Sequence, residues 1–442
     1  MRWEAPVCHY AHHVDEGDLT ALLRRHASTH SVPGAAIGIL HNGVSTTAYF
    51  GVADATTGEP VTAETRFSAG SLTKTMVATV IARLAQAGRL SLNDPVARHV
   101  PELSGSDWAA QATLRHLLAN RSGLPLRSDF EFGFDDRTDQ DEGALGRFAA
   151  EIAAAEPAGN FWSYTNVGWC LLGRAIETAT DATWEHAMRR YLLDPAGMRK
   201  TTFTTDPAPR HRALGHEITP DGPTPIEPLF SRAYGPAGTS VVLTVTDLLR
   251  FASLHVEDPS LAALRAVQAQ VSIYGWLDTW CLGLARFGWP GGQVWGWDGL
   301  VNGERSTLRI MPEHQAAIVL MTNSSTGRAM YRSLFTVLME ALFEISVPPL
   351  VLDAGPDAAS DLSRFAGVYA WPDQRVEVTA TEHGLVITDG LNETEAIPLD
   401  GRTFLVDPAD PDNPTVTFGK FDAAGRPRVL YLMLWGLPRV EA

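Results

Sequence analysis

The segment at residues 66–75 constrains the fold of this chain most, because two small residues lead directly into an apolar helical pattern. Ala69 and Gly70 precede Ser71, and apolar side chains then recur at three- and four-residue steps. We expect Ser71 in the first turn of a buried helix, with Lys74 one turn further along the same face. A serine hydroxyl becomes a good nucleophile when a base takes its proton. Burial and a helix N-terminus both favour the neutral lysine that such a base requires.

The spacing by itself leaves two interpretations open. Serine is a preferred helix N-cap, and Ser-x-x-Lys occurs by chance in many proteins. The complete segment at residues 67–74, Phe-Ser-Ala-Gly-Ser-Leu-Thr-Lys, resembles the active-site serine motif of the penicillin-binding-protein and class C β-lactamase superfamily of serine hydrolases. The resemblance implies that Ser71 attacks a carbonyl carbon and forms a covalent acyl-enzyme.

A second motif lies in an aromatic segment just before an apolar run at 171–179, which predicts a helix. Tyr164-x-Asn166 resembles the Tyr-x-Asn motif of the same superfamily. A phenol serves as acid or base when nearby cations favour its ionised form, and an amide can bond both Lys74 and a substrate carbonyl. The resemblance implies that Ser71, Lys74 and Tyr164 are catalytic and that Asn166 binds substrate.

The third motif departs from the superfamily pattern. Relatives usually hold Lys-Thr-Gly or His-x-Gly, whose cation binds a substrate carboxylate, whereas this chain has Trp297-Asp298-Gly299. An indole offers an apolar face and one N–H donor, so the variant is similar to that of esterases in the superfamily. Asp298 would repel an anionic substrate if it pointed into the cleft. Gly299 is expected to keep the strand close to the substrate, and the backbone N–H groups of Leu300 and Ser71 are expected to form an oxyanion hole.

The order of predicted elements indicates an α/β (α+β) domain of the β-lactamase/transpeptidase type, with an antiparallel sheet flanked by helices. Residues 16–30 have an amphipathic helical pattern, and 35–40 and 44–51 predict a hairpin that shares its sheet with later strands at 306–311 and 316–322. A short helix within 113–125 is expected to end at a glycine cap. The polar stretch at 129–142 is either a loop over the site or an ordinary surface excursion.

Beyond residue 345 the composition and the hydrophobic pattern of the sequence change. A Pro- and Asp-rich stretch at 346–358 predicts a linker between a serine hydrolase domain at 1–345 and a C-terminal domain at 359–442. Short alternating strands there predict an all-β sandwich or barrel, with its last strand at 429–434. This region resembles the lipocalin-like C-terminal domain of some esterases and D-aminopeptidases of this group.

Composition narrows the range of partners. The formal charge of -16 argues against nucleic acid and anionic membrane. The three cysteines show no metal-ligand spacing, so no metal or cofactor is expected. No stretch approaches the length of a membrane span, and the start has no apolar signal region, so a cytoplasmic enzyme with a small-molecule ester or amide substrate is the simplest interpretation. The oligomeric state is open.

Several functions remain at this point. The first is an esterase or amidase acting on small neutral substrates, and not a resistance β-lactamase. The second is a cytoplasmic acyltransferase of biosynthesis that passes the acyl group to an amine or alcohol, and the third is a D-aminopeptidase-like peptidase. A catalytically silent binding protein is disfavoured, because Ser71, Lys74 and Tyr164 are all present. The motifs do not distinguish Lys74 from Tyr164 as the primary base, and Arg127 or Arg137 is the expected alternative source of the missing cation.

Overall fold

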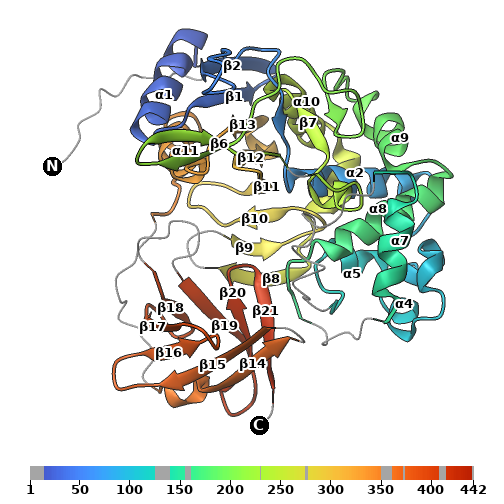
Figure 1. Ribbon diagram of the computed structural model, residues 1–442, viewed down its shortest axis with the longest axis vertical. Coiled ribbons are helices and arrows are strands. Elements are labelled where there is room, and N and C mark those ends of the chain that lie inside the picture. The colour runs from blue at the N-terminus through green and yellow to red at the C-terminus, as the bar shows by residue number, and fades with distance from the viewer. Residues whose placement is uncertain are drawn as a thin grey trace.

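The computed structural model describes residues 14–124, 140–154, 161–228, 230–273, 277–349, 361–371, 374–407 and 415–440. They form an α/β domain built on an antiparallel sheet and, at the C-terminal end, a closed all-β barrel (Figure 1). This confirms the predicted fold class. Arg127, Arg137, most of the stretch at 129–142 and most of the linker at 346–358 lie outside the described residues, so those expectations stay predictions.

The main sheet has eight strands in the order β2-β1-β13-β12-β11-β10-β9-β8, all antiparallel to their neighbours. Its first two strands pair as the predicted hairpin, and β13 pairs with β1, so early and late segments share one sheet as expected. The third motif lies on strand β11, in agreement with the expectation that Gly299 belongs to a strand. The strands are β1 (Gly34–His41), β2 (Val44–Gly51), β8 (Ala269–Ile273), β9 (Leu277–Trp280), β10 (Ala285–Phe287), β11 (Val294–Val301), β12 (Glu304–Met311) and β13 (Ala316–Thr322).

Helices bury their apolar faces against this sheet. In α1 (Glu16–Thr29) the carboxylate of Asp15 caps the first turn by accepting from the backbone N–H of Asp18 at 2.8 Å, and its leucines face the core. The long helix α11 (Gly327–Phe343) packs beside α1 (Figure 1). Helix α2 (Leu72–Gln86) packs on β11, and helix α10 (Val245–Glu257) packs on β13. The sheet therefore holds the start of α2 close to β11.

One helix end differs from its prediction. Helix α5 (Leu114–Leu118) ends earlier than expected, and Asn120, not the expected glycine, takes the left-handed conformation that follows it, with φ 51°. The buried amide of Asn120 accepts a hydrogen bond from the indole of Trp169 at 3.1 Å. The other α-helices and short strands among the described residues of this domain are α3 (Val96–His99), α4 (Asp107–Gln111), α7 (Ala144–Glu151), α8 (Val167–Thr180), α9 (Trp184–Met188), β3 (Phe67–Ser68), β4 (Thr202–Phe203), β5 (His216–Thr219), β6 (Gly222–Pro225) and β7 (Val241–Leu243).

The C-terminal barrel closes where β14 pairs with β21, with Tyr369 opposite Arg439. The strand predicted at 429–434 is present as β20, but it ends at Leu432 and is not the last, because the chain turns at Met433 and a further strand, β21, follows. Sequence reasoning missed β21 because it contains Gly436 and Pro438, which weaken a strand pattern. The barrel strands are β14 (Gly367–Trp371), β15 (Gln374–Ala380), β16 (Leu385–Thr388), β17 (Glu393–Pro398), β18 (Thr403–Leu405), β19 (Thr415–Phe421), β20 (Pro427–Leu432) and β21 (Trp435–Val440). Across the described residues, no helix combines the length and apolar character needed to cross a membrane.

Helix α10 carries a buried histidine that links it to α2. The Nε2 atom of His255 lies 2.9 Å from the hydroxyl of Thr79. Burial lowers the pKa of His255 to about 3, from an ordinary value of 6.5. His255 is therefore neutral in the folded protein, whereas the unfolded chain binds a proton below pH 6.5. The stability that this neutral histidine contributes above pH 6.5 is lost as the pH falls toward 3.

We expect His255→Gln to flatten the acid side of the stability profile. The amide of glutamine can bond to Thr79 but does not titrate. In wild type, the free energy of unfolding should fall by on the order of 1.4 kcal/mol for each pH unit between the unfolded and folded pKa values of His255, and the variant should not show this fall. Urea unfolding of both proteins at steps from pH 7 to pH 4 measures this. Parallel profiles for the two proteins would show that His255 does not set the acid sensitivity.

Candidate active site

Ser71 lies where α2 begins, and its side chain does not cap the helix. The preceding Gly70 has φ 53°, and a Cβ at this position would lie 2.7 Å from the backbone nitrogen of Leu300. Only glycine therefore lets β11 approach the start of α2 so closely. The Ser71 Oγ faces Lys74 instead of the helix backbone, which favours the nucleophile interpretation over the helix cap.

The side chain of Lys74 is fully buried and meets three oxygen atoms. Its Nζ lies 3.0 Å from Ser71 Oγ, 2.8 Å from Asn166 Oδ1 and 2.5 Å from the carbonyl oxygen of Ala237. A neutral amine has two donors for the two carbonyl oxygens and a lone pair for the serine proton, whereas an ammonium has three donors for the same three oxygens. Lys74 can therefore take the proton of Ser71 without moving.

Tyr164 lies between Lys74 and the third motif. The centre of its ring is 4.8 Å from Lys74 Nζ, and its hydroxyl accepts a hydrogen bond from the indole of Trp297 at 3.2 Å. The rings of Trp297 and Tyr164 also pack at a tilt of 34° with their centres 5.4 Å apart, and Trp280 meets Trp297 edge-on at 4.7 Å. Trp297 is 2% exposed, so the residue expected to contact substrate mainly supports Tyr164.

The carboxylate of Asp298 forms a bidentate ion pair with a buried arginine. Arg309 Nη1 and Nη2 lie 2.8 and 3.0 Å from the two Asp298 oxygens, and Arg309 also donates to the Tyr331 hydroxyl at 2.6 Å. Burial raises the pKa of Tyr331 to about 12, so this phenol stays neutral. Asp298 borders the cavity, but Arg309 compensates its charge, so the expected repulsion of anionic substrates by Asp298 loses its basis.

The edge of β11 beside Ser71 presents backbone groups. Strand β10 pairs with β11 only as far as Gly296, so the following residues have no partner from β10. A Cβ on Gly299 would lie 2.1 Å from the carbonyl oxygen of Ala69, so this glycine lets β11 lie against the segment that leads into Ser71. The backbone nitrogen of Leu300 packs against Gly70, which precedes Ser71. This placement suits the predicted oxyanion hole of the Ser71 and Leu300 N–H groups.

A cavity of about 420 Å³ opens beside these groups. It brings together all the predicted site residues except Lys74, which lies behind Ser71; they are Ser71, Tyr164, Asn166, Trp297, Asp298, Gly299 and Leu300. Sequence reasoning missed several other residues of the lining, among them Arg305, Arg328, Met433, Leu434 and Trp435. Within the described ranges no three His, Cys, Asp or Glu side chains gather as metal ligands would.

The missed residues had only weak sequence signals. A charge inside the apolar strand at 308–311 was the available signal for Arg309. For the cavity residues at 433–435, the signal was an apolar run that continues through a hairpin turn, which the prediction took as uninterrupted strand. Neither signal indicates by itself where in the fold the residue lies.

Comparisons with known proteins agree with this architecture. The family model described as Beta-lactamase matches residues 19–342. Penicillin-binding protein 4 of Amycolatopsis lactamdurans is 30% identical over 363 residues, which cover 77% of this chain and 93% of that protein.

Solved structures extend the similarity to the barrel. SurE has a TM-score of 0.80 at 27% identity, over 96% of this chain and 99% of SurE. The crystal structure of SurE with D-Leu has a TM-score of 0.78 at 28% identity, over 95% of this chain and 98% of that one. A class C β-lactamase from Rhodobacter sphaeroides, at 21% identity and a TM-score of 0.60, shares the fold over 72% of this chain and 98% of its own.

Proposed function

Because this chain belongs to the β-lactamase family of serine hydrolases, we propose that it forms an acyl-enzyme on Ser71 from small esters or amides that are neutral near the scissile bond. The observation that carries the proposal is the contact of Lys74 with both Ser71 Oγ and Asn166, at 3.0 and 2.8 Å. A base within hydrogen-bond distance of a serine hydroxyl is the arrangement that acyl transfer requires.

The proposed reaction has two stages, acylation of Ser71 and transfer of the acyl group to a second nucleophile. Ser71 Oγ bonds to the carbonyl carbon while its proton moves to Lys74, and the N–H groups of Ser71 and Leu300 stabilise the oxyanion. The tetrahedral intermediate then expels the leaving alkoxide or amine, which receives the proton with the help of Tyr164. In the second stage another nucleophile bonds to the acyl carbon as its proton moves to the same base. Ser71 Oγ then leaves, takes the proton back and releases the acyl product.

Two features of the cavity refine this proposal. Its lining includes Met433, Leu434 and Trp435, and an apolar wall that displaces water favours an amine or alcohol as the second nucleophile. Acyl transfer is therefore our second candidate beside hydrolysis. The similar SurE was solved with D-Leu, which supports D-aminoacyl groups as donors to test first.

We expect the enzyme to prefer the methyl-capped member of a matched ester pair over the member with a free carboxylate beside the scissile bond. A positioned cation is worth ~2–3 kcal/mol to a carboxylate, and Trp297 supplies none where relatives hold Lys or His. Comparing kcat/KM for the pair measures this preference. Trp297→His is then expected to shift the ratio toward the free acid.

Arg305 and Arg328 provide the control for this prediction, because both border the cavity. If the free acid is the better substrate and the preference disappears in Arg305→Gln or Arg328→Gln, these arginines replace the missing cation. In that case the expected preference for neutral donors is wrong, and peptidase activity becomes the better proposal.

A further inference from the structure

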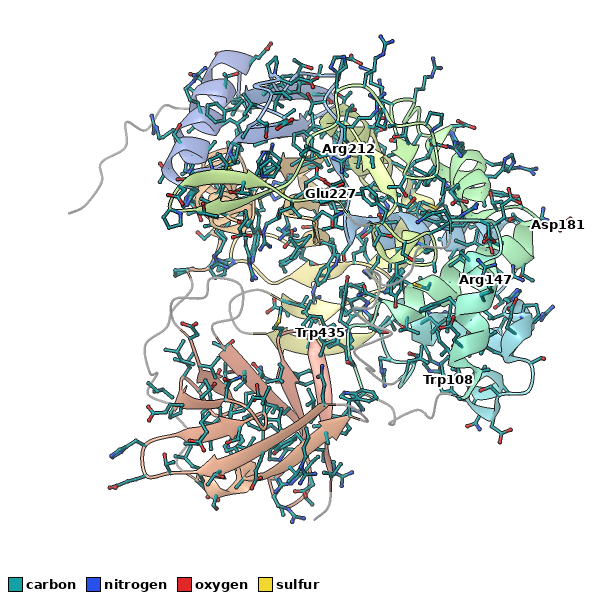
Figure 2. All side chains as sticks on the ribbon, viewed as in Figure 1. Trp108, Arg147, Asp181, Arg212, Glu227 and Trp435 are labelled. Atoms are coloured by element: carbon teal, nitrogen blue, oxygen red, sulfur yellow. The ribbon has the colours of Figure 1, made fainter. Side chains whose placement is uncertain are left out.

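The part of the barrel that reaches the cavity is the hairpin turn between β20 and β21. Leu432 pairs with Trp435, so Met433 and Leu434 are the two turn residues. Met433, Leu434 and Trp435, which we name the barrel turn, border the same cavity as Ser71. Figure 2 shows Trp435 at the end of the barrel that faces the sheet of the α/β domain.

The residues of the barrel turn are unusual for a two-residue hairpin. Met433 has φ 55°, a conformation in which such turns normally hold glycine or asparagine. A side chain with a Cβ costs roughly 1–2 kcal/mol in this left-handed region. Met433 is thus an apolar side chain at a strained position, and the geometry of the turn does not explain its presence. Its place in the lining of the cavity does explain it.

The barrel turn is fastened to the second motif. The carbonyl oxygen of Leu434 accepts from the backbone N–H of Tyr164 at 3.0 Å, and the N–H of Gly436 donates to the Ser163 hydroxyl at 3.1 Å. A Cβ on Gly436 would lie 3.0 Å from the Phe161 ring, so the two segments are in close contact. These bonds fix the turn relative to Tyr164.

The inside of the barrel offers a contrast. Its described interior is filled by aromatic rings in mutual contact, with Phe365 at 5.0 Å from Phe404 and 4.8 Å from Phe418. Closure through β14 and β21 also pairs the strands that would otherwise be edges. The feature that connects this domain to the chemistry is therefore its rim at the barrel turn.

We infer that the barrel turn is a specificity element that limits the size of the acyl group that Ser71 can carry. The inference rests on the proposed function, which supplies the acyl-enzyme. A cavity of about 420 Å³ is at the small end of ligand sites, and the barrel contributes three apolar residues, Met433, Leu434 and Trp435, to its lining. The substrate class is a donor with a short, apolar acyl group.

The test is a series of p-nitrophenyl esters from acetate to octanoate with the full-length protein. Wild type is expected to favour short chains. Trp435→Ala and Met433→Gly are each expected to raise the octanoate-to-butyrate ratio of kcat/KM by about tenfold or more, because each methylene accommodated in an apolar pocket is worth ~10-fold or more. Met433→Gly also suits the positive φ, so it keeps the hairpin if Trp435→Ala weakens the barrel.

Leu391→Ala is the matched control. Leu391 is 93% exposed between β16 and β17, so this change trims an apolar barrel residue at another turn and should leave the ratio unchanged. A ratio within about twofold of wild type for both turn variants, with Ser71 still acylated by the short esters, would overturn the inference and leave the proposed function standing. No acylation of Ser71 in wild type would instead overturn the proposed function.

Discussion

Ser71→Ala is expected to lower kcat/KM for a good ester substrate by on the order of a thousandfold or more. The hydroxyl that this change removes is the one that Lys74 contacts at 3.0 Å, so no acyl-enzyme can form. The helix should tolerate the loss, because the Ser71 side chain makes no capping bond to α2. Activity and stability therefore separate at this residue: turnover falls while the midpoint of thermal unfolding changes little.

Ser104→Ala is a suitable control for the general effect of removing a serine, since Ser104 is exposed and away from the cavity lining. Its kcat/KM should match wild type. If Ser71→Ala retains most of the turnover while still folded, another group is the nucleophile and the assignment fails.

The second large effect concerns Lys74 and Tyr164, whose losses are expected not to add. Each single change, Lys74→Ala or Tyr164→Phe, should lower the single-turnover acylation rate strongly, and the double variant should cost little more than the worse single variant. We attribute this to the proposed sharing of the proton between the two residues, since Lys74 Nζ contacts Ser71 Oγ and lies 4.8 Å from the centre of the Tyr164 ring.

Measuring the four acylation rates in one double-mutant cycle decides this point. Circular dichroism on each variant is the control, because Lys74 is buried and its loss leaves the oxygens of Asn166 and Ala237 without its donors. Independent roles would give free-energy losses that sum, and a sum within about 0.5 kcal/mol would contradict the coupled unit.

Local patterns accounted for much of the α/β domain. The apolar residues that recur after Ser71 predicted a buried helix, since a helix that packs on all sides is mostly apolar. Helix α2 is indeed buried along most of its length. The hairpin of β1 and β2 followed from the turn residues Asn42 and Gly43 between two strand segments. In both cases the residues that determine the structure are neighbours in the chain.

The remaining features depend on residues far apart in the chain. The pairing of Asp298 with Arg309 follows from strands that lie side by side, and no period in the sequence encodes the partner of a buried charge. The barrel turn meets Tyr164 across 270 residues of sequence. The hydrogen bond from Trp169 to the Asn120 amide likewise depends on how α8 packs.

Intact-protein mass spectrometry after brief exposure to an activated neutral ester, such as p-nitrophenyl butyrate, tests directly whether Ser71 carries the acyl group. We expect a mass increase of one butyryl group, located on the peptide that contains Ser71 and absent from Ser71→Ala. An amine added afterwards should remove the group faster than water alone if transfer is the reaction. A butyryl group on a different residue, or hydrolysis of the ester that Ser71→Ala retains in full, would show that Ser71 is not the nucleophile.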